Sequence, residues 1–129
     1  MEQRKLGRSE LDCSVIALGT WAFNAKVYGP VAVADATSTV RRALDEGITL
    51  FDTAPLYGSS EEDGISEKIL GQALGTDREG GLITTKFGRR PTTGNKPEFD
   101  GAHAIASVEA SLRRLGTDRI DVLFFHSPF

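Results

Sequence analysis

Cysteine and histidine are scarce in this sequence of 129 residues, which has one cysteine and two histidines. Cys13 has no second cysteine with which to form an internal disulfide. The two histidines lie 23 residues apart, so the sequence has no cluster at metal-ligand spacing and we expect no bound metal. Such a low cysteine content is typical of a reducing compartment, and we therefore expect the protein to be cytoplasmic.

Long apolar runs and basic stripes are missing as well. No stretch approaches the ~20 apolar residues needed to span a bilayer, and the polar start MEQRKLGRSELD does not resemble a secretory signal. Acidic residues outnumber basic residues by 18 to 15, and the basic residues are scattered, which argues against nucleic acid as a partner. With 40% hydrophobic and 26% charged residues, the chain is typical of one globular domain that binds neither a membrane nor nucleic acid.

Four short apolar runs rich in β-branched residues alternate with segments of helical period. The runs cover residues 15–18, 48–51, 82–85 and 120–125 and are predicted strands. Between them, apolar residues step by three and four over residues 33–44, 65–74 and 105–115. Gly47, Gly75 and Gly116 follow these segments, as is typical of helix ends. The pattern predicts an α/β fold with a parallel sheet built from βα units.

Three local features complete the predicted layout. Residues 4–6 and 11–13 flank the turn sequence GRS, which predicts an N-terminal β-hairpin. Residues 89–100 have no period and contain two prolines and a glycine, which predicts a long loop between a strand and a helix. The tetrapeptide GTDR occurs at residues 75–78 and again at 116–119, each time before a predicted strand, and is a weak sign of a repeated unit.

The spacing of the predicted strands favours a barrel over an open sheet. Strands start every 33 to 38 residues, close to what ~250 residues divided among eight units give in a (β/α)8 barrel of the TIM type. Four units are present, so residues 1–129 are expected to form the N-terminal half of such a barrel domain. The alternative is an open flavodoxin-like sheet. We disfavour it because its first strand normally ends in acidic residues, whereas the first strand here ends in Gly19-Thr20-Trp21.

Titratable residues follow three of the predicted strands at the point where each strand ends. Asp52 follows the second strand, Lys86 the third and His126 the fourth, and Tyr57 lies in the loop after Asp52. Taken singly, each has an ordinary explanation as a turn aspartate, a solvated lysine, a loop histidine or an exposed tyrosine. Because the carboxyl ends of parallel strands meet at one edge, we instead expect the four side chains to lie together as a candidate catalytic site.

Proton transfer to a carbonyl oxygen is the chemistry that this set suits. A neighbouring ammonium stabilises the anionic form of a phenol, so Lys86 is expected to make Tyr57 the proton donor. Asp52 is expected to hold Lys86, and His126 to orient the substrate oxygen. None of these side chains can supply a hydride, so a reduction would need a nicotinamide or a similar carrier.

The chain resembles the aldo-keto reductase family over essentially its whole length. The resemblance is carried by the segments LGRSELDCSVIALGTW, FDTAPLYG, TTKFG and SLRRLGTDRIDVLFFH, which contain all four candidate residues. It implies a (β/α)8 barrel, reversible reduction of aldehydes or ketones, and NADP(H) bound without a Rossmann fold. The lack of any G-x-G-x-x-G segment agrees with this. By the same resemblance, Gly19, Thr20, Trp21 and Asp52 lie beside the nicotinamide.

The main departure from that family is length, because family members are roughly twice as long and hold the cofactor phosphates with loops of the second half of the barrel. The adjacent Arg89 and Arg90 are interpreted as solvated loop residues and not as a replacement anion site. Two hypotheses follow. One is a carbonyl reductase acting on a small carbonyl or alcohol substrate. The other is a catalytically silent assembly or regulatory module that binds nicotinamide. The expected macromolecular partner is a second copy or a complementary C-terminal half.

Overall fold

The computed structural model describes residues 1–23, 28–58 and 60–129 of the chain, and its elements fall into a small hairpin and a larger α/β unit. The strands are β1 (Gln3–Lys5), β2 (Asp12–Ser14), β3 (Ala17–Gly19), β4 (Leu50–Asp52), β5 (Leu82–Phe87) and β6 (Val122–Phe125). The α-helices are α1 (Val33–Asp45), α2 (Ile65–Leu74) and α3 (Gly101–Leu115), and two short 3-10 helices cover Gly75–Gly80 (η1) and Pro91–Thr93 (η2).

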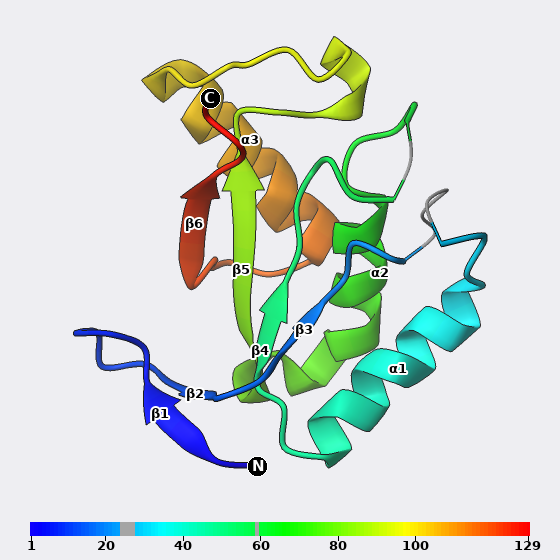
Figure 1. The fold of residues 1–129 in the computed structure, drawn as a ribbon, viewed down its shortest axis with the longest axis vertical. Coiled ribbons are helices and arrows are strands. Elements are labelled where there is room, and N and C mark those ends of the chain that lie inside the picture. The colour runs from blue at the N-terminus through cyan, green and yellow to red at the C-terminus, as the bar shows by residue number, and fades with distance from the viewer. Residues whose placement is uncertain (24–27, 59) are drawn as a thin grey trace.

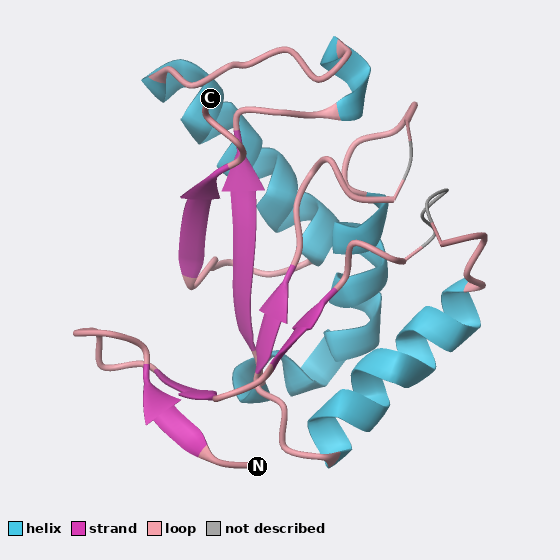
Figure 2. Cartoon of the chain, in the orientation of Figure 1, coloured by secondary structure: helices cyan, strands magenta, loops and turns pink. Residues whose placement is uncertain are grey.

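The four-stranded sheet has the order β3-β4-β5-β6, and every neighbouring pair is parallel. The three helices lie together on one side of this sheet (Figures 1 and 2). A doubly wound open sheet reverses its strand order and carries helices on both faces. The sequential order with one-sided helices therefore matches consecutive βα units of a barrel and not the flavodoxin-like alternative.

The predicted hairpin is present, and it explains why the first barrel strand begins later than expected. β1 pairs antiparallel with β2, with Arg4 opposite Cys13. The ladder continues one residue further, because the Val15 N–H donates to the carbonyl of Glu2 at 3.1 Å. The prediction that β3 starts at residue 15 is therefore wrong, since Val15 still belongs to the hairpin and β3 begins at Ala17.

The helices end where the glycine pattern placed them, and β5 starts at Leu82 as predicted, but β4 and β6 each start two residues later than predicted. The Ile48 N–H donates to the carbonyl of Ala43 at 2.9 Å, which completes the end of α1 around Gly47 at φ 79°. Ile48 is thus bound to the helix, and β4 begins only at Leu50. The connector after α2 forms the 3-10 helix η1, which the sequence pattern did not predict.

The core lies between the sheet and the helices. Its centre is fully buried and joins α1, α2, β4 and β5 through Val40, Leu70, Phe51 and Ile83. Small side chains such as Ala36 and Ala73 are also buried where the helices approach one another. This packing fixes one face of the sheet and so fixes the directions in which the strand-end residues project.

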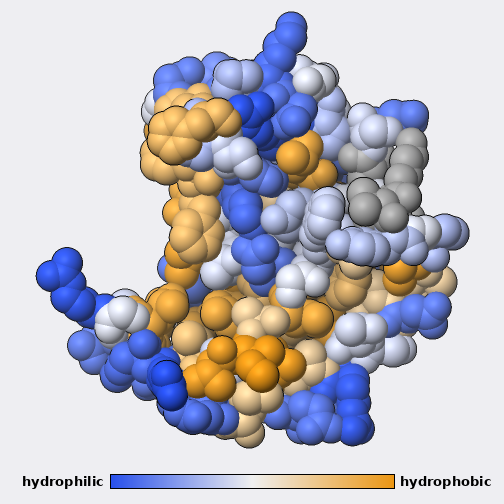
Figure 3. Space-filling model, in the orientation of Figure 1, coloured by the Kyte–Doolittle hydropathy of each residue, from blue (hydrophilic) through white to orange (hydrophobic). Residues whose placement is uncertain are grey.

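The opposite face of the sheet is open. A hollow of about 470 Å³ lies against it, lined by Leu6, Gly7, Ala17, Leu50, Asp52, Thr84, Val122 and Phe124. Apolar side chains gather over β6 and across the lower part of this face (Figure 3). Phe124 and Phe125 of β6 are 48% and 58% exposed.

No helix among the described residues is long and apolar enough to cross a membrane.

The two GTDR connectors contact each other at the end of the molecule where the strands begin. The Arg78 guanidinium donates to the Asp121 carboxylate at 2.8 Å, to the Arg119 carbonyl at 3.0 Å and to the Thr117 hydroxyl at 3.1 Å. Arg119 in turn forms a two-bond contact with Glu79 at 2.8 and 2.9 Å. The first connector thereby anchors the start of β6.

Candidate active site

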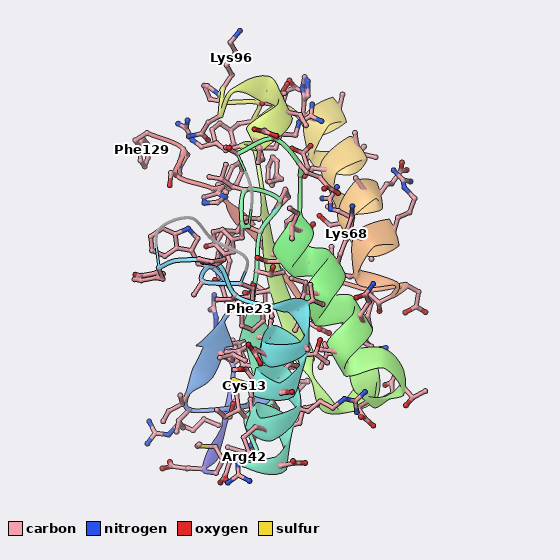
Figure 4. All side chains as sticks on the ribbon, turned by 90° about the vertical axis from the view of Figure 1, so that its right-hand side faces the viewer. Cys13, Phe23, Arg42, Lys68, Lys96 and Phe129 are labelled. Atoms are coloured by element: carbon pink, nitrogen blue, oxygen red, sulfur yellow. The ribbon has the colours of Figure 1, made fainter. Side chains whose placement is uncertain are left out.

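The strand-end residues meet at the end of the sheet where the strands finish. The carboxyl ends of β5 and β6 point to the same end of the molecule as Lys96 and Phe129, opposite Cys13 and Arg42 (Figures 1 and 4). Asp52 is the last residue of β4, Lys86 is the last but one residue of β5, and His126 directly follows β6. The topology therefore brings residues 34 to 74 positions apart in the chain to one place.

Lys86 and Asp52 form an ion pair at the centre of this group. The Lys86 ammonium donates to Asp52 Oδ1 at 2.6 Å and to the Thr53 carbonyl at 2.9 Å. The lysine side chain is only 15% exposed and that of Asp52 34% exposed, so the pair is largely shielded from water. The ammonium is therefore fixed in position by two acceptors from the neighbouring strand end.

The Tyr57 ring lies against the Lys86 ammonium, and His126 lies against the Tyr57 ring. The Lys86 Nζ atom is 4.8 Å from the centroid of the Tyr57 ring. The His126 imidazole meets the same ring edge to face, with centroids 5.7 Å apart and planes at 88°. The structure thus brings together Asp52, Tyr57, Lys86 and His126, the four predicted catalytic residues, while their roles stay predictions.

Tyr57 is placed by a tight loop. Its N–H donates to the Ala54 carbonyl at 3.1 Å, and its own carbonyl accepts from the Ser66 N–H at 3.2 Å. The next residue, Gly58, has φ 115°, and a Cβ there would approach the Cβ of Ile65 to 2.8 Å. Only glycine suits this backbone and this close approach, so the loop returns sharply to α2 and leaves the tyrosine ring over the strand ends.

Burial lowers the pKa of His126 below its ordinary value of 6.5, and the Lys86 ammonium lowers it further, while Asp52 opposes the change. His126 Nδ1 is buried and has no hydrogen-bond partner among the described residues. Both observations indicate a neutral imidazole at neutral pH.

We therefore expect the His126 imidazole to titrate below pH 6.5 in an NMR titration. Because the folded protein then binds this proton more weakly than the unfolded chain does, the His126 contribution to stability is complete above pH 6.5. It is lost as the pH falls through the folded pKa. His126→Asn removes the resonance and assigns it. A midpoint at or above 6.5 would contradict the burial argument.

The three predicted cofactor residues at the end of β3 have different surroundings. Gly19 pairs with Asp52 and has open space where a Cβ would lie. Thr20 is fully buried, and its hydroxyl donates to the Asp52 carbonyl at 3.1 Å, so it supports the backbone of that residue. Trp21 is 47% exposed and packs edge to face against Tyr28 with centroids 5.6 Å apart.

Sequence reasoning missed two contributors. The Thr84 hydroxyl donates to Asp52 Oδ1 at 2.7 Å, the same oxygen that Lys86 contacts. The strand register was the available signal, because Thr84 pairs with Asp52 across β4 and β5. Arg89, interpreted above as solvated, instead donates to backbone carbonyls, and Arg90 pairs with Glu98 at 3.0 Å. Arg89 is therefore more than a solvated loop residue, whereas the Arg90 side chain is 42% exposed and remains partly solvated.

The described residues include no group of histidine, cysteine, aspartate and glutamate side chains that could hold a metal ion. What the site offers is a fixed ammonium, a phenol, a neutral imidazole and a carboxylate around one exposed edge. Such a set can donate a proton and hydrogen bonds to an oxygen atom.

Comparison with known proteins gives a consistent result. The family model described as Aldo/keto reductase family matches residues 15–129. The chain is 37% identical to L-galactose dehydrogenase of Arabidopsis thaliana over 129 residues, and 37% identical to the aldo-keto reductase YhdN of Bacillus subtilis over 133 residues. These matches cover 98% and 99% of the chain but 38% of each relative, so the chain spans about two fifths of their length.

Another relative, 38% identical over 132 residues, is a Schizosaccharomyces pombe protein with the provisional description voltage-gated potassium channel subunit beta. Among solved structures, the holo form of aldo-keto reductase AKR11C1 from Bacillus halodurans superposes with a TM-score of 0.81 at 30% identity. This superposition covers 98% of the chain and 40% of that structure. An aldo-keto reductase from Klebsiella pneumoniae in complex with NADPH gives 0.68 at 25% identity, covering 89% of the chain and 36% of that structure.

Proposed function

The chain belongs to the aldo/keto reductase family, and from this premise we propose that the protein reduces aldehydes or ketones to alcohols with NADPH. Residues 1–129 would supply the proton-transfer part of the active site. The observation that carries the proposal is the Lys86–Asp52 ion pair of 2.6 Å, which holds an ammonium 4.8 Å from the centre of the Tyr57 ring.

Tyr57 is the proton donor in this proposal. As the carbonyl becomes an alkoxide, its oxygen takes the phenolic proton and a phenolate remains. The Lys86 ammonium stabilises that phenolate, because opposite charges attract strongly in a site shielded from water. Asp52 keeps the ammonium in place but leaves one donor free, since Lys86 has three N–H bonds and two acceptors among the described residues.

His126 orients the substrate oxygen. A neutral imidazole carries one N–H donor, and we place it on Nε2 because a proton on the buried Nδ1 would have no acceptor among the described residues. Burial, the main cause of the lowered His126 pKa, keeps the ring in this neutral form at neutral pH. Its donor and the Tyr57 hydroxyl then converge on one oxygen atom.

The nicotinamide side of the cofactor would lie against Gly19, Trp21 and Asp52. When bound, NADPH supplies the hydride that none of these side chains can provide. The fit is supported by the open space beside Gly19 and by the half-exposed indole of Trp21, which offers a flat apolar face next to Asp52. The phosphate groups would be held by parts of the protein beyond residues 1–129, in keeping with the share of each relative that the chain covers.

A regulatory role is the second candidate. It is favoured by the relative described as a potassium channel subunit beta, which is as similar to the chain as the enzymes are. In that case the same residues would bind nicotinamide without useful turnover. The catalytic set does not distinguish the two roles, because a slow reductase and a nicotinamide sensor can share it.

Turnover separates the two candidates. The whole protein is incubated with NADPH and a panel of small aldehydes and ketones, and loss of NADPH is followed by its absorbance. We expect steady consumption with an equal yield of alcohol. Binding of NADPH without consumption across the panel would favour the regulatory role, and no binding at all would contradict both.

We also expect residues 1–129 to associate when isolated. The hollow of about 470 Å³ and the exposed β6 side chains leave an apolar face and two strand edges without partners. Two copies related by a twofold axis would supply eight strands, and each copy would cover the open sheet face of the other. Light scattering coupled to size exclusion should therefore give a dimer or larger species, and a monodisperse 13.9 kDa monomer with cooperative unfolding would contradict this.

A further inference from the structure

Arg89 binds the backbone around His126, although Arg89 lies in the loop after β5 and His126 lies after β6. Its Nε donates to the His126 carbonyl at 3.2 Å and to the Ser127 carbonyl at 2.8 Å, and its NH1 donates to the Asn95 carbonyl at 2.9 Å. One guanidinium thus joins the loop after β5 to the residues after β6. Among the described residues the side chain pairs with no acidic group, so its role is to bind carbonyl oxygens.

Two of these carbonyls belong to residues in an unusual conformation. Asn95 and Ser127 have φ values of 64° and 49°, and they are the only residues other than glycine with positive φ in the described ranges 1–23, 28–58 and 60–129. Left-handed backbone is unfavourable for side chains with a Cβ. Ser127 also precedes Pro128, which restricts its backbone further. Asparagine tolerates this region better than most residues, so Ser127 is the residue that depends on outside support, and Arg89 supplies it.

Arg89 is itself held by its surroundings. Gly88 has φ 100°, and a Cβ there would approach Phe99 Cε1 to 1.8 Å, so only glycine lets the Phe99 ring pack at this point. The Arg89 guanidinium lies 5.9 Å above the centroid of that ring. The Glu98 N–H donates to the Gly88 carbonyl at 2.9 Å and closes the loop. The Phe99 ring and the closed loop therefore hold the Arg89 guanidinium in position.

We propose that Arg89 is a positioning residue for His126. The His126 N–H donates to the Phe87 carbonyl at 2.9 Å, which fixes the peptide before the histidine. Arg89 fixes the peptide after it, and the two contacts together direct the imidazole into its edge-to-face contact with the Tyr57 ring. The proposal rests on the proposed function for its catalytic consequence, but the positioning itself is a property of the structure.

The kinetic test compares Arg89→Met with Arg90→Met in the whole protein. Methionine keeps the apolar stem and removes the donors. Arg90 is a matched control because it is the neighbouring arginine and its side chain pairs with Glu98 instead of with the backbone around His126. We expect kcat/KM for carbonyl reduction to fall on the order of 10- to 100-fold in Arg89→Met, since small misplacements of a catalytic group carry losses of that size. Arg90→Met should stay within about twofold of wild type, because the Arg90 side chain pairs with Glu98 and Asp63 and not with the carbonyls around His126, so its loss leaves the imidazole in place.

A double variant separates positioning from general stability. If Arg89 acts through His126, Arg89→Met should cause little further loss in a His126→Ala background. Equal losses in both backgrounds would show a merely structural role and overturn the proposal. Should Arg89→Met fold poorly, Arg89→Lys keeps the charge and the stem but cannot reach three carbonyls, and it should show a smaller loss of kcat/KM with the same dependence on His126.

A spectroscopic arm tests the geometry without turnover. The Tyr57 ring, edge to face with His126, should shift the imidazole proton resonances of the wild-type protein. Arg89→Met should move the His126 resonances toward their unfolded positions, and Arg90→Met should not. Unchanged resonances in Arg89→Met would overturn the proposal even if activity fell. If no carbonyl is reduced by the wild-type protein, the proposed function fails, and the resonances still decide the positioning.

Discussion

Replacing Tyr57 by phenylalanine should lower kcat for carbonyl reduction on the order of 10²- to 10⁴-fold, the range contributed by a positioned general acid. The substitution removes the hydroxyl alone, so the ring should keep its place beside Lys86 and against His126. The dissociation constant for NADPH should therefore change little. Steady-state kinetics of the whole protein, with cofactor binding followed by fluorescence, would measure both quantities.

Lys86→Met is the informative companion variant. It keeps the phenol and removes the ammonium that stabilises the phenolate, so activity should fall and its pH profile should change. Loss of kcat in Tyr57→Phe with a wild-type pH profile in Lys86→Met would show that Tyr57 acts without Lys86. Retention of most of the wild-type kcat in Tyr57→Phe would place the acid elsewhere.

Glu67→Gln should cost about 3–5 kcal/mol of unfolding free energy, the range for breaking a buried ion pair. Glu67 is fully buried on α2, where Oε2 accepts from Arg114 at 2.6 Å and Oε1 accepts from the Thr85 hydroxyl at 2.7 Å. The Arg114 side chain, from α3, is only 15% exposed. The neutral amide leaves this guanidinium without its charge partner inside the protein.

Denaturant unfolding of Glu67→Gln and of the double variant Glu67→Met/Arg114→Met would measure this. Replacing both Glu67 and Arg114 by methionine should recover much of the loss, because an apolar pair of similar volume needs no charge compensation. The control is the Arg42–Glu46 pair on α1, whose side chains are 75% and 56% exposed. Glu46→Gln should change the unfolding free energy by less than about 1 kcal/mol. Equal effects at the two pairs would contradict the argument from burial.

The order of strands and helices was predictable because glycine ends the helices and β-branched runs follow them. Strand starts were less predictable, since they depend on contacts between distant segments. Val15 joins the hairpin through Glu2, and Ile48 completes the end of α1. Neither hydrogen bond leaves a signal in the local pattern, so both residues look like the first positions of strands.

The burial of one ion pair was also beyond the sequence. Glu67 is a charged residue in the first turn of α2, where a carboxylate is expected to face solvent. The helix instead packs between α1, α3 and the sheet, and Glu67 is buried. Charged residues are rarely buried without a partner, and the partner, Arg114, lies 47 residues away. Residue spacing within one helix cannot reveal such a pair.

The four catalytic candidates were predictable for a different reason. Parallel strands end at one edge, so a titratable residue after each apolar run is enough to predict that Asp52, Lys86 and His126 meet. What supports them was not predictable in this way. Thr84 reaches Asp52 through the strand register, and Arg89 reaches His126 across 37 positions of the chain.

The two arginines at opposite ends of β6 have a consequence for how this strand can change in evolution or in the laboratory. Arg78 binds the residues that precede the strand, and Arg89 binds those that follow it. Arg78 donates to the Arg119 carbonyl and the Asp121 carboxylate, and Arg89 donates to the His126 carbonyl. None of these hydrogen bonds involves the side chains of Leu123 or Phe124. In isolated residues 1–129, polar substitutions at Leu123 and Phe124 should therefore be able to limit association while His126 keeps its place.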